Sequence, residues 1–110
     1  MTYYDSMERN YEDLRNAIVF QAVRDYQRGL CKLHDNPNDG KGHIEIRECE
    51  RFFKSDWCAA LTKTPGDALM KMAEDQIREC NYDMKKLKSV YNENAKSSMQ
   101  FTRNGVIIVK

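Results

Sequence analysis

The 110-residue sequence predicts a mainly α-helical fold: a small bundle of three to four helices with a long last helix and a short C-terminal β-hairpin. Two long segments carry apolar residues at three- and four-residue spacing, which is the period of an amphipathic helix. Only 2 Pro and 5 Gly interrupt the chain, so long regular elements are expected. Near the C-terminus, Asn104-Gly105 stands between β-prone residues, which is a strong short-range signal for a hairpin.

The composition fits a single globular domain over residues 1–110, with a helical core at about 6–80 and a C-terminal helix extension and hairpin at about 81–110. Hydrophobic residues make up 41% of the chain and charged residues 32%. The net charge of +1 lacks the basic excess of most nucleic-acid-binding domains and the acidic excess of a DNA mimic. No apolar run approaches the ~20 residues that span a bilayer, and the first residues lack a signal-peptide pattern. We therefore expect a cytoplasmic protein with no membrane partner.

The first helix is expected to begin after Asp5 or Ser6, either of which can cap it, and to end near Leu33. Its apolar residues cover about half of the helix circumference, which is wider than the stripe of an ordinary surface helix. We therefore expect this helix at the centre of the bundle, with neighbours on two sides. The apolar positions are Tyr11, Leu14, Ile18, Val19, Ala22, Val23, Tyr26, Leu30 and Leu33.

The same helix carries a basic ridge formed by Arg24, Arg28 and Lys32, which follow at four-residue steps. Two interpretations of this ridge remain open. It is either a solvated helix face or a contact surface for an acidic partner.

A turn at Asn36-Pro37 separates this helix from a second one, which is expected from about Gly42 to Lys54. Ser55 is a good N-cap for a short third helix that ends near Thr62.

Phe52, Phe53 and Trp57 form the predicted core anchor, because aromatic side chains carry the largest apolar surface per residue. Trp57 is the only Trp in the chain, and we expect it to pack against the first helix.

The last helix is expected to begin at Thr64-Pro65, with Thr64 as its N-cap and Pro65 in its first position. Apolar residues then alternate three- and four-residue steps in a narrow seam. The only break in the helical signal is Asn81-Tyr82-Asp83, and two outcomes remain open. Either the chain folds back near Asn81, or the helix continues for ~30 residues and its C-terminal half seeks a partner. The seam consists of Met70, Ala73, Ile77, Cys80, Met84, Leu87 and Tyr91.

The sequence contains no catalytic motif of the kinds that glycine-rich phosphate loops, nucleophile elbows or zinc-protease helices provide. We therefore predict no enzymatic activity, no catalytic residue and no cofactor. Cys31, His34, His43 and Cys49 sketch a C-x2-H…H-x5-C zinc pattern. The gap between His43 and Cys49 puts them on different helix faces, so we predict no metal site.

Several short segments of the sequence resemble those of a group of short uncharacterised proteins from phages, prophages and other mobile elements of Gram-positive bacteria. The resemblance covers about residues 11–80 and carries no established function. It implies a setting, because small non-enzymatic phage proteins commonly act by binding host machinery, and anti-defence inhibitors such as anti-CRISPRs are one such class. The segments that carry the resemblance are Asn16-Ala17-Ile18-Val19, Gln21-Ala22-Val23-Arg24-Asp25-Tyr26, Asn36-Pro37-Asn38, Glu50-Arg51-Phe52-Phe53-Lys54-Ser55-Asp56-Trp57 and Ala60-Leu61-Thr62.

The leading hypothesis is a phage accessory protein that binds a host protein or complex and inhibits or redirects it. Its C-terminal module and its basic groups would form the contact surface, because the apolar residues after Cys80 exceed what the first part of the chain can cover. A homodimer through the C-terminal helix or hairpin is an alternative, as are a small nucleic-acid-binding protein and a sponge for a nucleotide signal. The predicted partner-binding residues are Arg24, Arg28, Lys32, Lys85, Lys86, Lys88, Tyr91 and Phe101.

Overall fold

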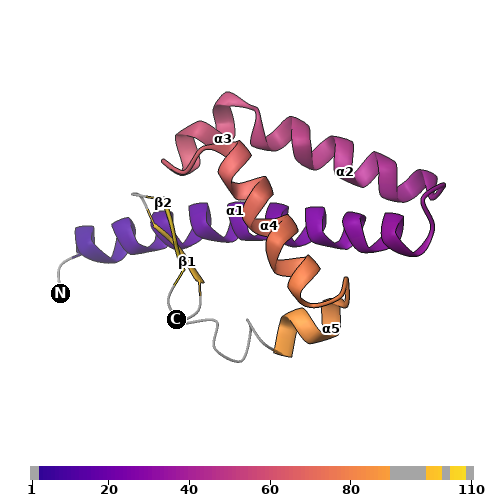
Figure 1. The fold of residues 1–110 in the computed structure, drawn as a ribbon. Coiled ribbons are helices and arrows are strands. Elements are labelled where there is room, and N and C mark those ends of the chain that lie inside the picture. Colours follow the sequence, from indigo (N-terminus) through magenta and orange to yellow (C-terminus); the bar gives the residue numbers. More distant parts are fainter. Residues whose placement is uncertain (1–2, 90–98, 103–104, 109–110) are drawn as a thin grey trace.

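A 33-residue helix, α1 (Tyr3–Asp35), runs through the molecule, and the other elements are arranged around it (Figure 1). The computed structural model describes the backbone of residues 3–89, 99–102 and 105–108, and the side chains of residues 11–89. Four further helices follow α1 in this part of the chain, so the predicted mainly helical fold is confirmed. They are α2 (Gly40–Phe53), α3 (Asp56–Leu61), α4 (Gly66–Glu79) and α5 (Met84–Leu87).

The predicted central position of α1 is confirmed, because α2 runs back along it and α4 starts beside the end of α2 and crosses α1 (Figure 1). Val19 and Val23 are buried beneath these neighbours. α1 and α2 pack tightly at Gly29, where an added Cβ would lie 2.8 Å from the Ile46 side chain. A side chain at position 29 would therefore push the two helices apart.

Local capping explains where the middle helices begin. Asp39 caps α2 by accepting hydrogen bonds from the backbone N–H groups of Lys41 and Gly42 at 3.0 and 3.1 Å, so α2 starts two residues earlier than predicted. Ser55 caps α3, as predicted, and its hydroxyl accepts from the Cys58 N–H at 3.2 Å.

The predicted cap of α4 is wrong, because Pro65 itself occupies the N-cap position and the helix has no side-chain cap hydrogen bond. Pro65 has a ψ of 143°, which is an extended and non-helical value, so the first helical residue is Gly66. Thr64 therefore lies one position too early. Gly66 sits so close to the Phe53 carbonyl that an added Cβ would lie 1.9 Å from its oxygen, and only glycine fits there.

The predicted long last helix is also wrong, because the chain turns at Asn81 and Tyr82. Both residues have a left-handed backbone, with φ values of 56° and 57°. The Tyr82 N–H donates to the Ile77 carbonyl at 2.8 Å, which satisfies a carbonyl of the last turn of α4. Asp83 then caps α5 by accepting from the Lys85 N–H at 2.9 Å. Of the two outcomes left open by the sequence, the chain folds back near Asn81.

This turn brings Leu87 into the interior, where it is fully buried beside Cys31, Ile77 and Cys80. The expectation that Leu87 would remain as surplus apolar surface is therefore wrong. The larger buried cluster lies between α1, α2, α3 and α4. Its members are Val19, Val23, Tyr26, Cys49, Phe53, Cys58, Leu69, Met70 and Ala73.

The predicted aromatic anchor divides into three environments. Phe53 is buried, Phe52 is half-buried, and Trp57 is 58% exposed. The prediction of Trp57 as a core residue is therefore wrong. The Ser55 cap fixes the rotation of the short helix α3 so that Cys58 faces the core, and Trp57, one residue and ~100° away, faces outward.

Two short strands, β1 (Met99–Thr102) and β2 (Gly105–Ile108), pair antiparallel with Met99 opposite Ile108. In Figure 1 the pair lies across α1 on the same side as α4. Asn104 of the predicted turn, Tyr91 and the side chain of Phe101 lie outside the described residues. None of the helices within residues 3–89 combines the length and apolar composition needed to cross a membrane.

Candidate functional site

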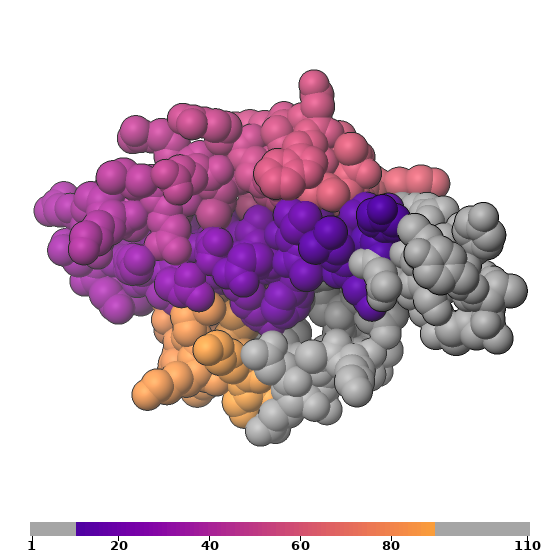
Figure 2. Space-filling view, turned by 180° about the vertical axis from the view of Figure 1, so that it is seen from behind, coloured from indigo at the N-terminus to yellow at the C-terminus, as the bar shows by residue number. Residues whose placement is uncertain are grey.

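A groove of about 560 Å³ lies between α1 and α2, with Trp57 of α3 at one end. All of its lining residues belong to α1, α2 and α3. Figure 2, seen from behind, shows α1 lying between α2 and α3 on one side and α5 on the other. The lining residues are Ile18, Gln21, Ala22, Asp25, Lys32, Lys41, Ile44, Glu45, Glu48, Cys49, Phe52 and Trp57.

The groove is hollow because two of its lining residues are small. Ala22 of α1 and Cys49 of α2 contribute little side-chain volume, and each lies about one helical turn from a larger lining residue, Ile18 and Phe52 respectively. Burial is the largest cause that raises the pKa of the Cys49 thiol to about 12, and the nearby Asp25 and Glu45 carboxylates add to it. The thiol is therefore uncharged at neutral pH.

The end of the groove at α3 is apolar and exposed. Trp57 stands edge-on to Phe52, with ring centroids 5.5 Å apart and an interplanar angle of 85°. About two helical turns back along α2 from Phe52, beside Glu45, Ile44 is also 55% exposed. A large aromatic and a large aliphatic side chain therefore reach solvent along one groove, which is typical of a surface that contacts another apolar surface.

Further along the groove, ion pairs link its two walls. Lys32 of α1 contacts Glu45 of α2 at 2.7 Å, and Arg28 contacts Asp25 at 3.0 Å and Glu45 at 3.6 Å. These side chains are only partly exposed, and their charges are largely neutralised within the molecule. The groove therefore combines an apolar end at Trp57 with an ion-paired stretch around Glu45, where Ile44 also reaches solvent.

The predicted basic ridge is not one exposed surface, because Arg24 is buried. Its guanidinium donates to the Gln27 side chain at 3.0 Å and lies 4.6 Å from the centre of the Phe20 ring. Four-residue steps drift by ~40° each around a helix, so Arg24 points ~80° away from Lys32. That rotation carries Arg24 away from the groove and into the interior.

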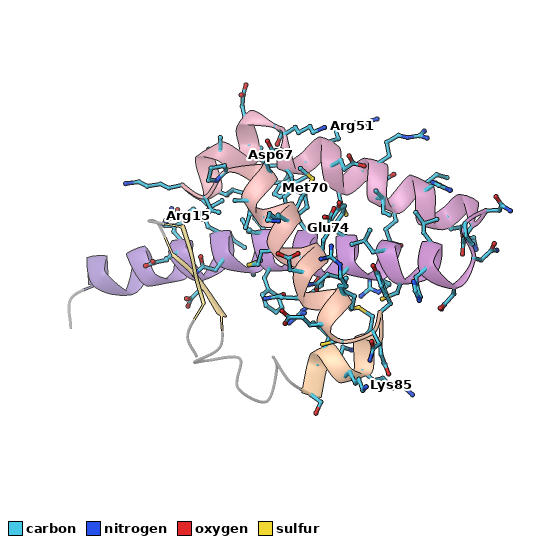
Figure 3. All side chains as sticks on the ribbon, in the orientation of Figure 1. Arg15, Arg51, Asp67, Met70, Glu74 and Lys85 are labelled. Atoms are coloured by element: carbon cyan, nitrogen blue, oxygen red, sulfur yellow. The ribbon has the colours of Figure 1, made fainter. Side chains whose placement is uncertain are left out.

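Lys85, Lys86 and Lys88 are exposed at α5, and Lys85 extends from the surface in Figure 3. Their side chains make no ion pair with any described residue. Their role in partner binding remains a prediction, as do those of Tyr91 and Phe101.

Other polar side chains act within the fold. Gln27 is fully buried, and its amide donates to Gln76 at 3.0 Å and to the Ala73 carbonyl at 3.2 Å. The Tyr26 hydroxyl donates to Glu74 at 2.8 Å, on the part of α4 labelled in Figure 3. Burial, followed by this hydrogen bond, raises the pKa of Tyr26 far above its usual value. These bonds hold α4 against α1.

The described cysteines and histidines do not form a reactive site. Burial raises the pKa of all four thiols, which keeps them protonated and weakly nucleophilic at neutral pH. The His34 ring stacks on Tyr82 with centroids 4.0 Å apart, and His43 contacts the Pro37 carbonyl at 2.8 Å. Among the residues whose side chains are described, no group of three or more His, Cys, Asp or Glu is arranged to hold a metal ion.

Reasoning from the sequence missed the groove. Ile44 gives a usable signal, because it lies off the inward face of α2 that Ile46, Cys49 and Phe53 share. The exposure of Trp57 leaves no such signal, because it depends on the rotation of α3.

Comparisons of the chain with protein-family models, with curated proteins and with solved structures returned no match. The groove must therefore be interpreted from its own residues.

Proposed function

We propose that this protein is a non-enzymatic binding protein whose α1–α2 groove docks onto an apolar surface of a partner protein. In the phage setting that the resemblance implies, the partner is a host protein or complex that the protein inhibits or redirects, with anti-defence inhibitors as one such class. The observation that carries the proposal is Trp57, which is 58% exposed at the end of the groove.

The exposed surface of Trp57 supports a binding role on energetic grounds. Aromatic side chains present roughly 150–250 Å², so about 100 Å² of Trp57 remains to be covered by a partner. At ~25 cal/mol per Å² this coverage would contribute about 2.5 kcal/mol, which is the scale of an interface hot spot. Phe52 supports the indole from inside, so the partner would meet a side chain that is already held in place.

The walls of the groove favour a helical partner segment. The groove follows α1 from Ile18 to Lys32, which corresponds to about 20 Å or four helical turns. A helix with apolar residues on one face can place them between α1 and α2 in the way that helix-in-groove complexes do.

The test is a pull-down from a Gram-positive host lysate treated with nuclease, using the wild-type protein and Trp57→Ala. We expect a host protein that the wild type retains and the variant loses. Lys71→Ala is the matched control, because Lys71 is an exposed residue of α4, which does not line the groove. Retention of the same partner by Trp57→Ala would contradict the proposal.

A second candidate function is nucleic-acid binding through Lys85, Lys86 and Lys88, which is favoured by their exposure and by their lack of ion pairs among the described residues. It is weakened because Arg28 and Lys32 are engaged by Asp25 and Glu45. Duplex binding that weakens steeply with salt and is lost when the three lysines are replaced by glutamate would favour this candidate.

A further inference from the structure

The apolar lining of the groove continues along α1 beyond the reach of α2. Tyr11 and Leu14 are 59% and 57% exposed, and they precede Ile18, Ala22 and Asp25 of the groove. At ~100° per residue, the side chains at −7, −4, +4 and +7 from Ile18 all point within about 40° of the direction of Ile18. These are Tyr11, Leu14, Ala22 and Asp25. They form one seam on a single face of α1, which we call the α1 seam.

The α1 seam is symmetric about Ile18. Leu14 and Ala22 each lie four residues from Ile18, and Tyr11 and Asp25 each lie seven residues from it. If a second α1 lies antiparallel across the first with Ile18 facing Ile18, then Leu14 faces Ala22 and Tyr11 faces Asp25. A large exposed side chain then faces a small one, and a hydroxyl faces a carboxylate.

We propose that the α1 seam is a self-association surface, on which a second copy of this chain packs its α1 antiparallel with a two-fold axis at Ile18. Such an interface is isologous, because the same patch serves both copies. Leu14 of each copy fills the space beside Ala22 of the other, and Trp57 covers the flank of the incoming helix. The inference shares its surface with the proposed function and names one occupant of that surface.

The hydrogen bonds of Asp25 leave room for the Tyr11 hydroxyl of a second copy. The Gln21 amide donates to Asp25 Oδ1 at 2.8 Å, and the Arg28 guanidinium donates to the same oxygen at 3.0 Å. Both bonds end on Oδ1, so Oδ2 is the oxygen that can accept from the phenol. A hydrogen bond to a charged carboxylate is stronger than one between neutral groups, which favours this register over its neighbours.

The length of the seam sets the strength of the dimer. From Tyr11 to Asp25 the helix rises about 21 Å, and at a helix width of about 10 Å this seam covers roughly 200 Å², which is smaller than the ~800 Å² per partner of a standard interface. We therefore expect a reversible dimer that forms at micromolar concentrations and that a host protein competing for the groove can dissociate.

Cysteine cross-linking tests the axis directly. In the full chain, Ile18→Cys places two thiols together at the two-fold axis, and glutathione disulfide can oxidise them to a disulfide while it is reduced to two thiols. Ala17→Cys is the matched control, because Ala17 is exposed but points ~100° away from the seam. The native cysteines are all buried, so they give a low background. We expect covalent dimer from Ile18→Cys and not from Ala17→Cys, and equal yields from the two variants would overturn the proposal.

Charge substitution at Tyr11 tests the register. Tyr11→Lys places an ammonium beside Asp25 and should retain the dimer, whereas Tyr11→Glu places a carboxylate there and should raise the dissociation constant at least about tenfold. Sedimentation velocity across a concentration series measures both. Equal effects of the two variants, or a wild-type protein that remains monomeric at roughly 0.5 mM, would overturn the proposal.

These outcomes separate the inference from the proposed function. A monomeric wild type whose Trp57→Ala variant loses a host partner leaves the proposed function standing and removes this inference. If the dimer forms with the expected cross-link but Trp57→Ala does not change the host pull-down, the self-association inference stands and the proposed function is removed.

Discussion

The two sides of α1 differ in how completely the rest of the molecule covers them. On the side facing α4 and α5, Val23 and Gln27 are fully buried, and the glutamine amide bonds to Gln76 and the Ala73 carbonyl. On the side of the groove, Ile18 and Ala22 are only half-buried. Both sides carry apolar residues at helical spacing, so spacing alone does not distinguish a core face from a binding face. The difference lies in which helix crosses which side.

The largest expected effect comes from comparing two isoleucines, one on each side. Ile77→Ala should lower the free energy of unfolding by about 2–5 kcal/mol, because Ile77 is fully buried and its truncation leaves a cavity. Ile44→Ala should change it by no more than about 0.5 kcal/mol, because Ile44 already reaches solvent. Urea denaturation followed by circular dichroism measures both. Equal losses would mean that the groove is covered in solution.

Two glutamines of α1 sharpen the comparison for polar groups. Gln27→Ala should lower the free energy of unfolding by about 2–3 kcal/mol, because it removes the bonds to Gln76 and Ala73 from a fully buried site and leaves their polar groups without these partners. Gln21→Ala removes one exposed bond to Asp25 and should cost less than about 0.5 kcal/mol. If the two variants have the same free energy of unfolding, the hydrogen bonds of Gln27 contribute no net stability.

The cysteines give a pH-dependent comparison. The pKa is about 11 for Cys31, on the α4 and α5 side, and about 12 for Cys49 in the groove, against 9.0 for an unperturbed thiol. The folded protein therefore holds these protons more tightly than the unfolded chain. Their stabilisation is complete below pH 9 and decreases as pH rises from 9 toward the folded pKa values.

Each thiol should thus contribute a decrease of about 1 kcal/mol per pH unit between pH 9.5 and 10.5. Denaturation at a series of pH values measures the slope, and Cys31→Ala and Cys49→Ala should each remove one such contribution. An unchanged slope in either variant would indicate that its thiol titrates at an ordinary pKa in the folded protein.

Much of the helical fold could be predicted from the sequence, because periodicity and capping are local. Spacing identified α1 and its central position, and Ser55 marked the start of α3. The sequence marks Asn81-Tyr82-Asp83 as the only break in the last helical segment and leaves open whether the chain folds back there. Two consecutive left-handed residues, rather than any loss of apolar spacing, fold α5 back and bury Leu87.

The groove could not be predicted, because it depends on relations between helices. Trp57 has a large apolar side chain of the type usually found in a core, and only the rotation of α3 turns it outward. Arg24 has a charged side chain of the type usually found at the surface, yet its contacts with Phe20 and Gln27 hold it in the interior. Both errors come from judging a side chain by its type when the path of the chain decides its surroundings.

Replacing Trp57 should have only a small effect on stability, and this effect separates a binding residue from a core residue. Trp57→Ala should lower the free energy of unfolding by less than about 1 kcal/mol, because the variant loses an edge-on contact with Phe52 and no enclosed packing. As the only Trp in the chain, Trp57 also reports its own environment by fluorescence. Its emission should be red-shifted and readily quenched by acrylamide in dilute protein, and less so when a partner covers the groove. A blue-shifted, protected emission at all concentrations, together with a destabilisation of several kcal/mol in the alanine variant, would place Trp57 in the core and remove the groove as a binding surface.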